Sequence, residues 1–245
     1  MDIKALAQKN FVAFKNNPYP GRIIILGMDE PGKRWIQIYC IMGRKENSRN
    51  RIFVCEDNIR LRTKAADPTK VTDPSLIIYK AMDSVDNTFV VSNGHQTDPA
   101  LIHRSKNPSL SGLKNLDQWQ YEPDEPNYTP RITGLIFNGS APCAEILILK
   151  KSRFDMRCQR HLFHYSTFFP GYGYCVTTYT GDGDPLPSFK GSPYLLPLSG
   201  SPYEMAHEIW EALDKPNRVS LAVKAIDIKT GQSTVIIANK YHAVD

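Results

Sequence analysis

Short apolar runs rich in β-branched residues recur along most of this chain, and they constrain its fold more than any other feature. Many of the runs are continuously apolar, which is typical of strands that are covered on both faces. Helical periodicity is confined to a few segments. The sequence therefore predicts an α+β fold in which two antiparallel sheets pack face to face, with helices outside them. We expect strands at residues 22–28, 35–42, 51–55, 76–82, 88–91, 131–138, 144–150, 160–167, 172–179, 220–229 and 233–238.

Three segments carry helix signals. Residues 1–14 place apolar side chains at helical spacing, with lysines between them. Thr97 or Asp98 can cap a second helix that has Pro99 at its first position. Ser201 opens a third helix, which continues through Leu213 with its apolar side chains on one face.

No change in composition marks a domain boundary, so we expect a single domain over residues 1–245. Residues 1–17 form an N-terminal helical extension in this interpretation. Residues 181–200 contain four prolines and four glycines. Such a composition is typical of an irregular excursion or lid.

The chain has a net charge of +5 and a pI near 8.9. Because Lys and Arg are scattered and no basic-aromatic motif occurs, we expect an anionic metabolite as partner and not nucleic acid. No apolar stretch approaches the ~18 residues of a transmembrane helix, so we expect no membrane partner. The five cysteines are far apart and form no CxxC pair, which indicates reduced thiols and a cytoplasmic protein.

Several common catalytic motifs are absent from the sequence. It contains no P-loop, no dinucleotide-binding glycine loop and no Gly-x-Ser-x-Gly elbow. His161 and His164 are three residues apart in a predicted strand, so their side chains point to opposite faces. We therefore expect neither a metal ion nor an organic cofactor.

Two dense polar clusters stand at the ends of predicted strands. Residues 92–98 (Ser-Asn-Gly-His-Gln-Thr-Asp) follow the strand at 88–91, and residues 127–131 (Asn-Tyr-Thr-Pro-Arg) lead into the next strand. Amides, hydroxyls and a guanidinium at strand ends can fix a small polar ligand on a rigid scaffold. These clusters are the first candidates for a binding site.

Three further candidates are each open to a second interpretation. Residues 48–51 (Ser-Arg-Asn-Arg) can hold a phosphate bidentately, or they form a solvated basic loop. Tyr79 lies on the apolar face of a predicted strand, as a core tyrosine would. Glu122 follows aromatic residues, which can raise the pKa of its carboxyl, but an exposed loop acid fits the same pattern.

Six segments stand in a recognisable order along the chain, namely Tyr19–Arg22, Asn50-Arg51, 90–98, Tyr121-Glu122, 127–132 and 172–179. In order and spacing they resemble the archaeal-type IMP cyclohydrolases, from about Tyr19 to the last strands. The resemblance implies a four-layer αββα sandwich similar to the N-terminal-nucleophile hydrolases, but without their autoprocessed nucleophile.

The same resemblance implies a purine ribonucleotide substrate. 5-Formamidoimidazole-4-carboxamide ribotide would lose water to give inosine monophosphate in de novo purine biosynthesis, without a cofactor. A homo-oligomer is compatible with the family and stays open.

The family's catalytic Arg, Tyr and Glu fall on Arg51, Tyr79 and Glu122. Arg51 and Glu122 each lie in a local motif match, whereas Tyr79 is placed by its strand position. Residues 1–17 have no counterpart in the family, and the excursion at 181–200 is longer than usual. We expect the substrate to contact Arg22, Asn50, Asn93, Gly94, His95, Thr97, Asp98, Asn127, Thr129 and Arg131.

This chemistry suits the residue types. Because the ring closure is intramolecular, near-attack geometry supplies much of the rate. A glutamate can move the proton, while an arginine and a tyrosine polarise the formyl oxygen.

Two alternative functions stay open. A true N-terminal-nucleophile amidohydrolase needs a Ser, Thr or Cys at its mature N-terminus, for example after cleavage before Cys40. The other alternative is a non-catalytic purine nucleotide-binding protein.

Overall fold

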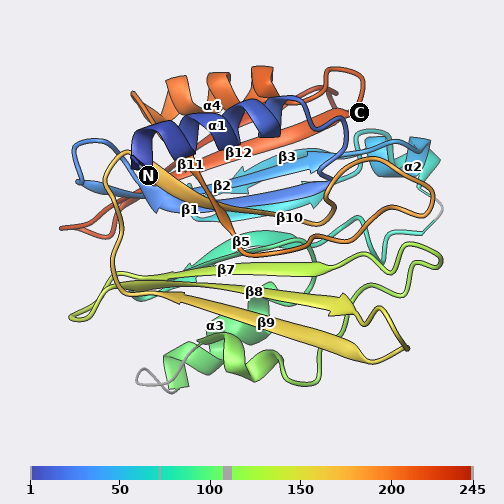
Figure 1. Cartoon of the computed structure of the whole chain (residues 1–245), viewed down its shortest axis with the longest axis horizontal. Helices are drawn as coiled ribbons and strands as arrows, with labels where there is room; N and C mark the ends of the chain where they lie inside the picture. Colours follow the sequence, from blue (N-terminus) through green and yellow to red (C-terminus); the bar gives the residue numbers. More distant parts are fainter. Residues whose placement is uncertain (1, 72, 107–111, 244–245) are drawn as a thin grey trace.

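The computed structural model describes residues 2–71, 73–106 and 112–243, and within them the strands form two antiparallel sheets (Figure 1). The first sheet has the order β11-β10-β1-β2-β12-β13. Its strands are β1 (Arg22–Met28), β2 (Arg34–Met42), β10 (Tyr172–Thr177), β11 (Tyr194–Pro197), β12 (Arg218–Asp227) and β13 (Ser233–Asn239).

The second sheet runs in sequence order from β3 to β9. Each neighbouring pair is antiparallel. Most connections are short, but a long one that contains α3 (Thr97–Lys106) and η2 (Gly112–Leu116) joins β6 to β7. Its strands are β3 (Ile52–Glu56), β4 (Arg60–Lys64), β5 (Lys80–Val85), β6 (Thr88–Ser92), β7 (Arg131–Phe137), β8 (Cys143–Lys151) and β9 (Cys158–Tyr165).

Helices cover the outer faces of both sheets. Helices α1 (Ile3–Lys15) and α4 (Pro202–Ala212) lie on the first sheet, and α3 (Thr97–Lys106) lies on the second (Figure 1). The short α2 (Glu46–Arg49) and the 3₁₀ turns η1 (Pro68–Lys70) and η2 (Gly112–Leu116) complete the described helical segments. The chain is therefore layered as helix, sheet, sheet and helix.

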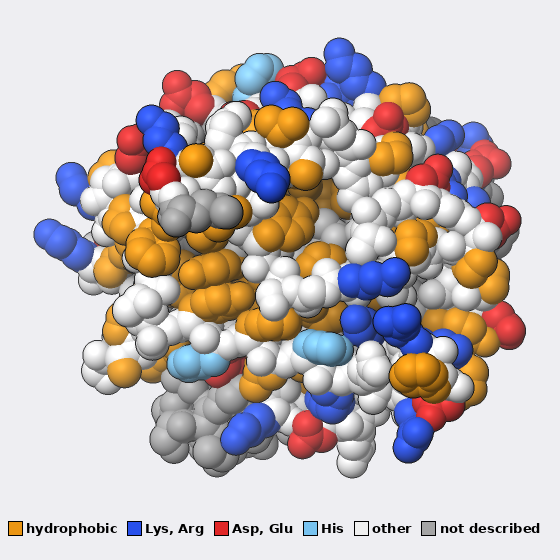
Figure 2. Space-filling view, viewed as in Figure 1, with side chains coloured by type: hydrophobic (Ala, Val, Ile, Leu, Met, Phe, Trp, Pro, Cys, Tyr) orange, Lys and Arg blue, Asp and Glu red, His pale blue; other side chains and the backbone are white. Residues whose placement is uncertain are grey.

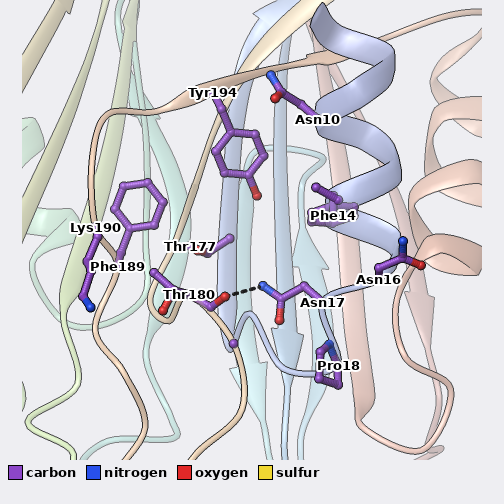
Figure 3. A pocket seen from close by; sticks show the side chains of 12 residues that line it. Asn10, Phe14, Asn16, Asn17, Pro18, Thr177, Thr180, Phe189, Lys190 and Tyr194 are labelled. Atoms are coloured by element: carbon purple, nitrogen blue, oxygen red, sulfur yellow. Dashed lines mark hydrogen bonds between the residues drawn. The ribbon is translucent and has the colours of Figure 1, made fainter.

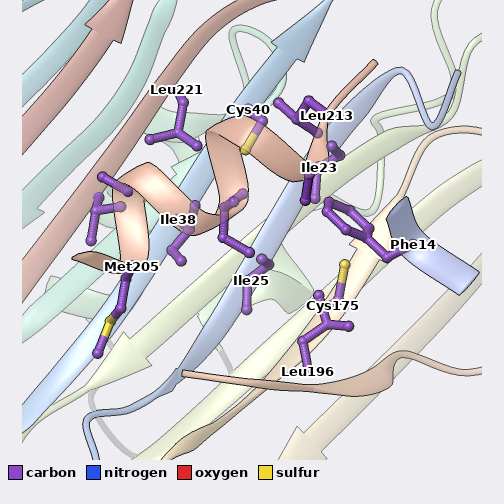
Figure 4. Close-up of a cluster of buried hydrophobic side chains, with 14 of the residues drawn as sticks. Phe14, Ile23, Ile25, Ile38, Cys40, Cys175, Leu196, Met205, Leu213 and Leu221 are labelled. Atoms are coloured by element: carbon purple, nitrogen blue, oxygen red, sulfur yellow. The ribbon is translucent and has the colours of Figure 1, made fainter. Parts of the chain in front are cut away.

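The alternation of side chains along each strand divides the apolar residues among three cores. In β1, Ile23 and Ile25 point toward α1 and α4, where they pack with Phe14 and Met205 (Figure 4). Ile24 and its neighbours on the opposite face pack against the second sheet. A third core, which includes Val90, Leu101 and Leu135, lies between the second sheet and α3.

Close packing of the two sheets requires a glycine. A Cβ atom at Gly134 in β7 would lie 3.0 Å from Leu26 Cδ1 in β1, so the missing side chain lets the two strands approach. The strands that carry Arg22 and Arg131 at their first positions therefore face each other across the sandwich.

Helices α1 and α4 lie where the sequence predicts helices. The Asp2 side chain accepts a hydrogen bond from Lys4 N, and the helix buries Phe11 and Phe14, while Met1 lies outside the described residues. Ser201 and Glu204 form a reciprocal capping box at the start of α4. None of the described helices is long and apolar enough to cross a membrane.

The strand and helix predictions need four corrections. The strand expected at 76–82 begins only at Lys80, because residues 74–78 form a turn in which Ile77 N and Ile78 N donate to Pro74 O. Strands β4 and β11 are additional, and β11 lies within the excursion at 181–200. Helix α3 begins at Thr97, so Pro99 is its third residue and not its first.

The face shown in Figure 2 carries a band of hydrophobic side chains between the two sheets, and a group of Lys and Arg side chains toward the side on which α2 lies. Aromatic rings account for part of the packing at this level of the sandwich. Tyr165 stacks on Tyr174 with ring centroids 3.9 Å apart, and Phe168 meets both Tyr174 and Trp35 edge-on.

Candidate active site

A cavity of about 260 Å³ lies at the end of the sandwich where β1 and β7 begin and β10 ends. Arg22 at the start of β1 contributes to it, and the other lining residues come from segments that connect the strands. The cavity combines four basic and three acidic residues with tyrosine and threonine hydroxyls, and so suits a charged, polar ligand. Its lining residues are Tyr19, Arg22, Arg44, Lys45, Asn47, Ser48, Arg51, Leu76, Ile77, Glu122, Asp124, Glu125, Asn127, Thr129, Tyr179 and Leu186.

A buried ion pair joins the two sheets at this cavity. Nη2 of Arg22 donates to Oε1 of Glu122 at 2.6 Å, and the Glu122 side chain is 3% exposed. Asn93 Nδ2 donates to the same oxygen at 3.3 Å. The backbone N–H of Glu122 donates to Thr129 O at 2.9 Å, which fixes the loop that carries the carboxylate.

The pKa values at this pair follow from burial and from nearby charge. Burial raises the pKa of Glu122, and the positive charges of Arg22 and Arg131 offset this effect only in part. Burial alone would lower the pKa of Arg22, but Glu122 and the surrounding tyrosines outweigh it, so the pKa of Arg22 is raised and the residue stays charged. Glu122 is thus a carboxylate with an increased proton affinity.

Arg131 lies beside Glu122 without a direct ion pair. Its guanidinium stacks over the Trp119 ring at 5.2 Å and approaches Gln96 Oε1 at 3.4 Å. A Cβ atom at Gly94 would lie 2.4 Å from Arg131 Nη1, so the glycine leaves room for the guanidinium. Burial lowers the pKa of Arg131, and Glu122 counteracts it.

Arg51 brings a guanidinium with one unpaired nitrogen to the cavity. The residue is 1% exposed, and its Nε donates to Ser48 O at 2.9 Å. Its Nη1 atom, like Nε of Arg22, is buried and has no hydrogen-bond partner among the described residues. Buried unpaired N–H groups are costly, so these two atoms favour an acceptor-rich ligand in the cavity.

Two tyrosine hydroxyls meet near these arginines. The Tyr79 hydroxyl lies 2.6 Å from the Tyr39 hydroxyl, and both residues are buried. Burial and the neighbouring Tyr79 raise the pKa of Tyr39, while Arg22 and Arg51 act in the opposite direction. Tyr79 itself precedes β5, next to a second hollow of about 330 Å³ that His95 and Asp98 also line.

A second group of hydrogen-bonded hydroxyls lines the cavity that contains Glu122. Thr129 Oγ1 contacts both the Asp124 carboxylate and the Tyr179 hydroxyl. Burial raises the pKa of Tyr179 to about 12, although Arg22 and Thr129 oppose this shift. Tyr179 therefore remains a neutral hydrogen-bonding group at neutral pH.

Several of the residues expected at the site have side chains that brace the backbone. Asn93 Oδ1 accepts from Ile132 N at 2.8 Å, and Asn93 Nδ2 also donates to Pro130 O. Thr97 Oγ1 donates to Lys80 O, and Asn50 exchanges two 2.7 Å hydrogen bonds with the backbone of Asp67. These contacts hold in place the loops that carry Glu122, Tyr79 and Arg51.

The remaining expected residues divide between the two hollows. Asn127 and Thr129 line the cavity that contains Arg51 and Glu122. His95 Nε2 lies 3.0 Å from Ser75 O, and Asp98 pairs with Lys80 at 2.7 Å, both beside Tyr79. Sequence reasoning thus selected residues at both hollows.

The lining or neighbouring residues that were missed as site candidates include Tyr39, Arg44 and Tyr179. Tyr39 lies within an apolar strand and gives no local signal. Tyr179 and Arg44 each follow a strand by a residue or two, and that position is the signal that could have identified them. Among the described residues, no group of three or more His, Cys, Asp or Glu side chains could hold a metal ion.

These observations define an antiparallel two-sheet α+β protein with a buried Arg–Glu–Tyr site at one end of the sandwich. The chain belongs to the family described as IMP cyclohydrolase-like protein, which matches residues 19–232. The expected family is therefore confirmed. A comparison with curated proteins gives no significant match.

Proposed function

We propose that this protein is an IMP cyclohydrolase, which closes 5-formamidoimidazole-4-carboxamide ribotide to inosine monophosphate. The family match supports the reaction class. The observation that carries the proposal is the buried Glu122 carboxylate, which has a raised pKa and faces a cavity that also holds unpaired N–H groups of Arg51 and Arg22. We also propose that the layered fold is of the N-terminal-nucleophile-hydrolase type.

In the proposed reaction the carboxamide nitrogen attacks the formyl carbon, forming the new C–N bond of the ring. Glu122 accepts the proton that this nitrogen loses and passes it to the formyl oxygen, which becomes a hydroxyl on a tetrahedral carbon. As the C=N bond forms, Glu122 takes the proton that the formamido nitrogen loses and gives it to the hydroxyl, which leaves as water. The balance is one ribotide to one inosine monophosphate and one water.

The geometry of Glu122 suits a proton carrier. Arg22 and Asn93 both bond to its Oε1 atom, so Oε2 is the oxygen that we assign to proton transfer. Because burial raises its pKa, Glu122 is a stronger base than an exposed glutamate, while the positive charges of its two arginine neighbours partly offset this rise.

Arg51 and Tyr79 are proposed to stabilise the negative charge that develops on the formyl oxygen. The Arg51 Nη1 atom is a buried donor that has no acceptor among the described residues, so it can donate to a ligand. The Tyr79 hydroxyl already has Tyr39 as a hydrogen-bond neighbour, which orients it. Such pre-oriented donors act mainly on the transition state.

The anionic end of the nucleotide is proposed to lie toward the exposed rim of the cavity, where Arg44 and Lys45 supply positive charge. Arg131, whose charge also acts on Glu122, adds to the positive charge near the cavity. Guanidinium and ammonium groups around one opening favour a phosphate monoester.

The structure does not favour a terminal-nucleophile mechanism that starts at Cys40. This cysteine lies in β2 and belongs to the core under α1 and α4, on the face opposite to Tyr39. Burial raises the pKa of the Cys40 thiol well above its usual range, so it is a poor nucleophile. The other alternative, a non-catalytic purine nucleotide-binding protein, would have the same pocket and would differ only in the absence of turnover.

The proposal is tested by incubating the purified protein with the formamido ribotide and following inosine monophosphate by chromatography. The ribotide without protein and with heat-denatured protein gives the background. Formation of one inosine monophosphate per ribotide, in proportion to the protein added, supports the proposal. Binding of inosine monophosphate without turnover would favour the non-catalytic alternative.

A further inference from the structure

Residues 180–190, here called the strap, connect β10 to the segment before β11 and form one wall of the candidate active site. Leu186 lines the cavity, and its backbone N–H donates to Asn127 Oδ1 at 3.0 Å. Asp182 pairs with the Arg44 guanidinium, which also donates to Gly183 O at 3.0 Å. The position of the strap therefore determines where Leu186 and Arg44 lie.

A third cavity, of about 510 Å³, lies behind the strap (Figure 3). It separates the base of the strap from α1, so packed side chains do not fill this space. Thr180, Phe189 and Lys190 of the strap line one side, and Asn10, Phe14 and Asn17 line the other. Polar contacts across a cavity hold a segment in place where packing cannot.

Asn17 makes such a contact. Its Nδ2 donates to Thr180 O at 3.2 Å, as Figure 3 shows, and its Oδ1 accepts from Tyr19 N at 3.1 Å. Tyr19 lines the active-site cavity, and its ring stacks on that of Tyr179 at 6.0 Å. One amide therefore connects the end of α1, the site tyrosines and the base of the strap.

Asn17, the centre of this connection, lies outside the part of the chain that matches the family, whereas its partners Tyr19 and Thr180 lie within it. The match begins at residue 19, so α1 and Asn17 precede it. Helix α1 is nevertheless integrated into the fold, because Phe11 and Phe14 are buried in the core with β1 and β10. A helix that precedes the matched residues thus reaches the wall of the candidate active site.

We propose that Asn17 is a positioning residue that fixes the strap, so that α1 controls how tightly the active-site cavity holds its ligand. The inference rests on the proposed function for the identity of that ligand. It assigns α1 a role in affinity and no role in the chemical step, because Asn17 touches neither Glu122 nor Arg51.

The test uses Asn17→Asp in the full chain. This substitution keeps the oxygen that accepts from Tyr19 N and replaces the donor to Thr180 O by a second oxygen, which repels that carbonyl. The matched control is Asn16→Asp, which makes the same change of charge one residue away. The Asn16 side chain is exposed and forms no hydrogen bond with the described part of the chain.

Amide hydrogen exchange and calorimetric binding of inosine monophosphate are the two readouts. For Asn17→Asp we expect faster exchange over residues 180–190, unchanged exchange in β12, and a dissociation constant raised about three- to tenfold, as the loss of one hydrogen bond predicts. For Asn16→Asp we expect both values to match those of the unmodified protein. The kcat should remain unchanged in both variants.

Unchanged exchange over residues 180–190 in Asn17→Asp would overturn the inference. So would faster exchange with an unchanged dissociation constant, since the strap would then move without affecting the site. If the unmodified protein fails to bind inosine monophosphate, the proposed function fails, and the exchange measurement alone decides whether Asn17 holds the strap. Faster exchange in β12 as well would show general destabilisation and would also contradict a local role.

Discussion

Arg22 Nη2 lies 2.6 Å from Glu122 Oε1, and this contact joins the first residue of β1 to the loop before β7 inside a cavity. Removing one partner of a buried ion pair leaves the other charge uncompensated, which is strongly destabilising. A variant at Glu122 must therefore preserve hydrogen bonding to Arg22 if it is to report on catalysis and not on folding.

The pH dependence of turnover should reflect this environment. Because Glu122 must be ionised to accept a proton, kcat should rise with pH through the pKa of Glu122 in the complex. That pKa is raised by burial, so the acid limb should lie above the ordinary glutamate value of about 4.3. Initial rates measured from pH 4 to pH 8 test this. An acid limb at or below the ordinary value would remove Glu122 as the base.

Tyr79→Phe should lower kcat on the order of 10²-fold, because one donor to the developing oxyanion is lost. The matched control is Tyr39→Phe, which removes the other hydroxyl of the same 2.6 Å pair. We expect the control to lose a similar amount of stability and to keep more of its activity. Equal losses of kcat in the two variants would mean that the pair acts structurally.

Arg131→Ala should raise KM by roughly 10- to 100-fold, as expected for the loss of a charged hydrogen-bonding group. Gly94→Ala is a milder form of the same test. The new Cβ atom would displace the guanidinium of Arg131, but the positive charge of Arg131 would remain. We expect a smaller rise in KM for Gly94→Ala. Wild-type kinetics for Arg131→Ala would exclude this arginine from the site.

Lys224 provides a test of the fold that is independent of the activity. The residue is fully buried, donates to Ile59 O at 3.0 Å, and has a pKa lowered to about 8 by burial. In the unfolded chain the pKa returns to about 10.4. The unfolded state therefore binds more protons between these values, and the stability contribution of Lys224 increases as pH rises through this window.

The expected gain is on the order of 3 kcal/mol between pH 7 and pH 11. Chemical denaturation of the unmodified protein and of Lys224→Met across this pH range measures the contribution of Lys224. The other titrating groups are common to both proteins, so their contributions cancel in the difference. The difference in unfolding free energy should shift steadily in favour of the unmodified protein as pH rises. A difference that does not change with pH would contradict the lowered pKa.

Most of the strands could be predicted from the sequence, because short continuous apolar runs such as those of β1 and β12 are typical of buried strands. Strand β4 was missed because Arg60, Arg62 and Lys64 leave only alternate positions to face the core. Strand β11 was missed because it is short and ends at Pro197. In both cases pairing with a neighbouring strand outweighs a weak local preference.

The site was accessible only in part. Glu122 and Arg51 could be selected by motif, but their convergence on one cavity depends on two sheets meeting face to face. No neighbouring motif identifies Tyr39 as a functional residue, because it is one buried residue among apolar ones in a strand. Leu186 comes from a proline-rich segment whose path only tertiary contacts define.

The most direct test of the account compares the unmodified protein with Glu122→Gln in two assays, turnover of the formamido ribotide and binding of inosine monophosphate. The glutamine keeps the size of the side chain and an oxygen that can accept from Arg22, but it cannot take up the proton. We expect kcat to fall about 10²–10⁴-fold while inosine monophosphate still binds. Near-full turnover by Glu122→Gln would contradict the account, because the proton would then be moved by another group.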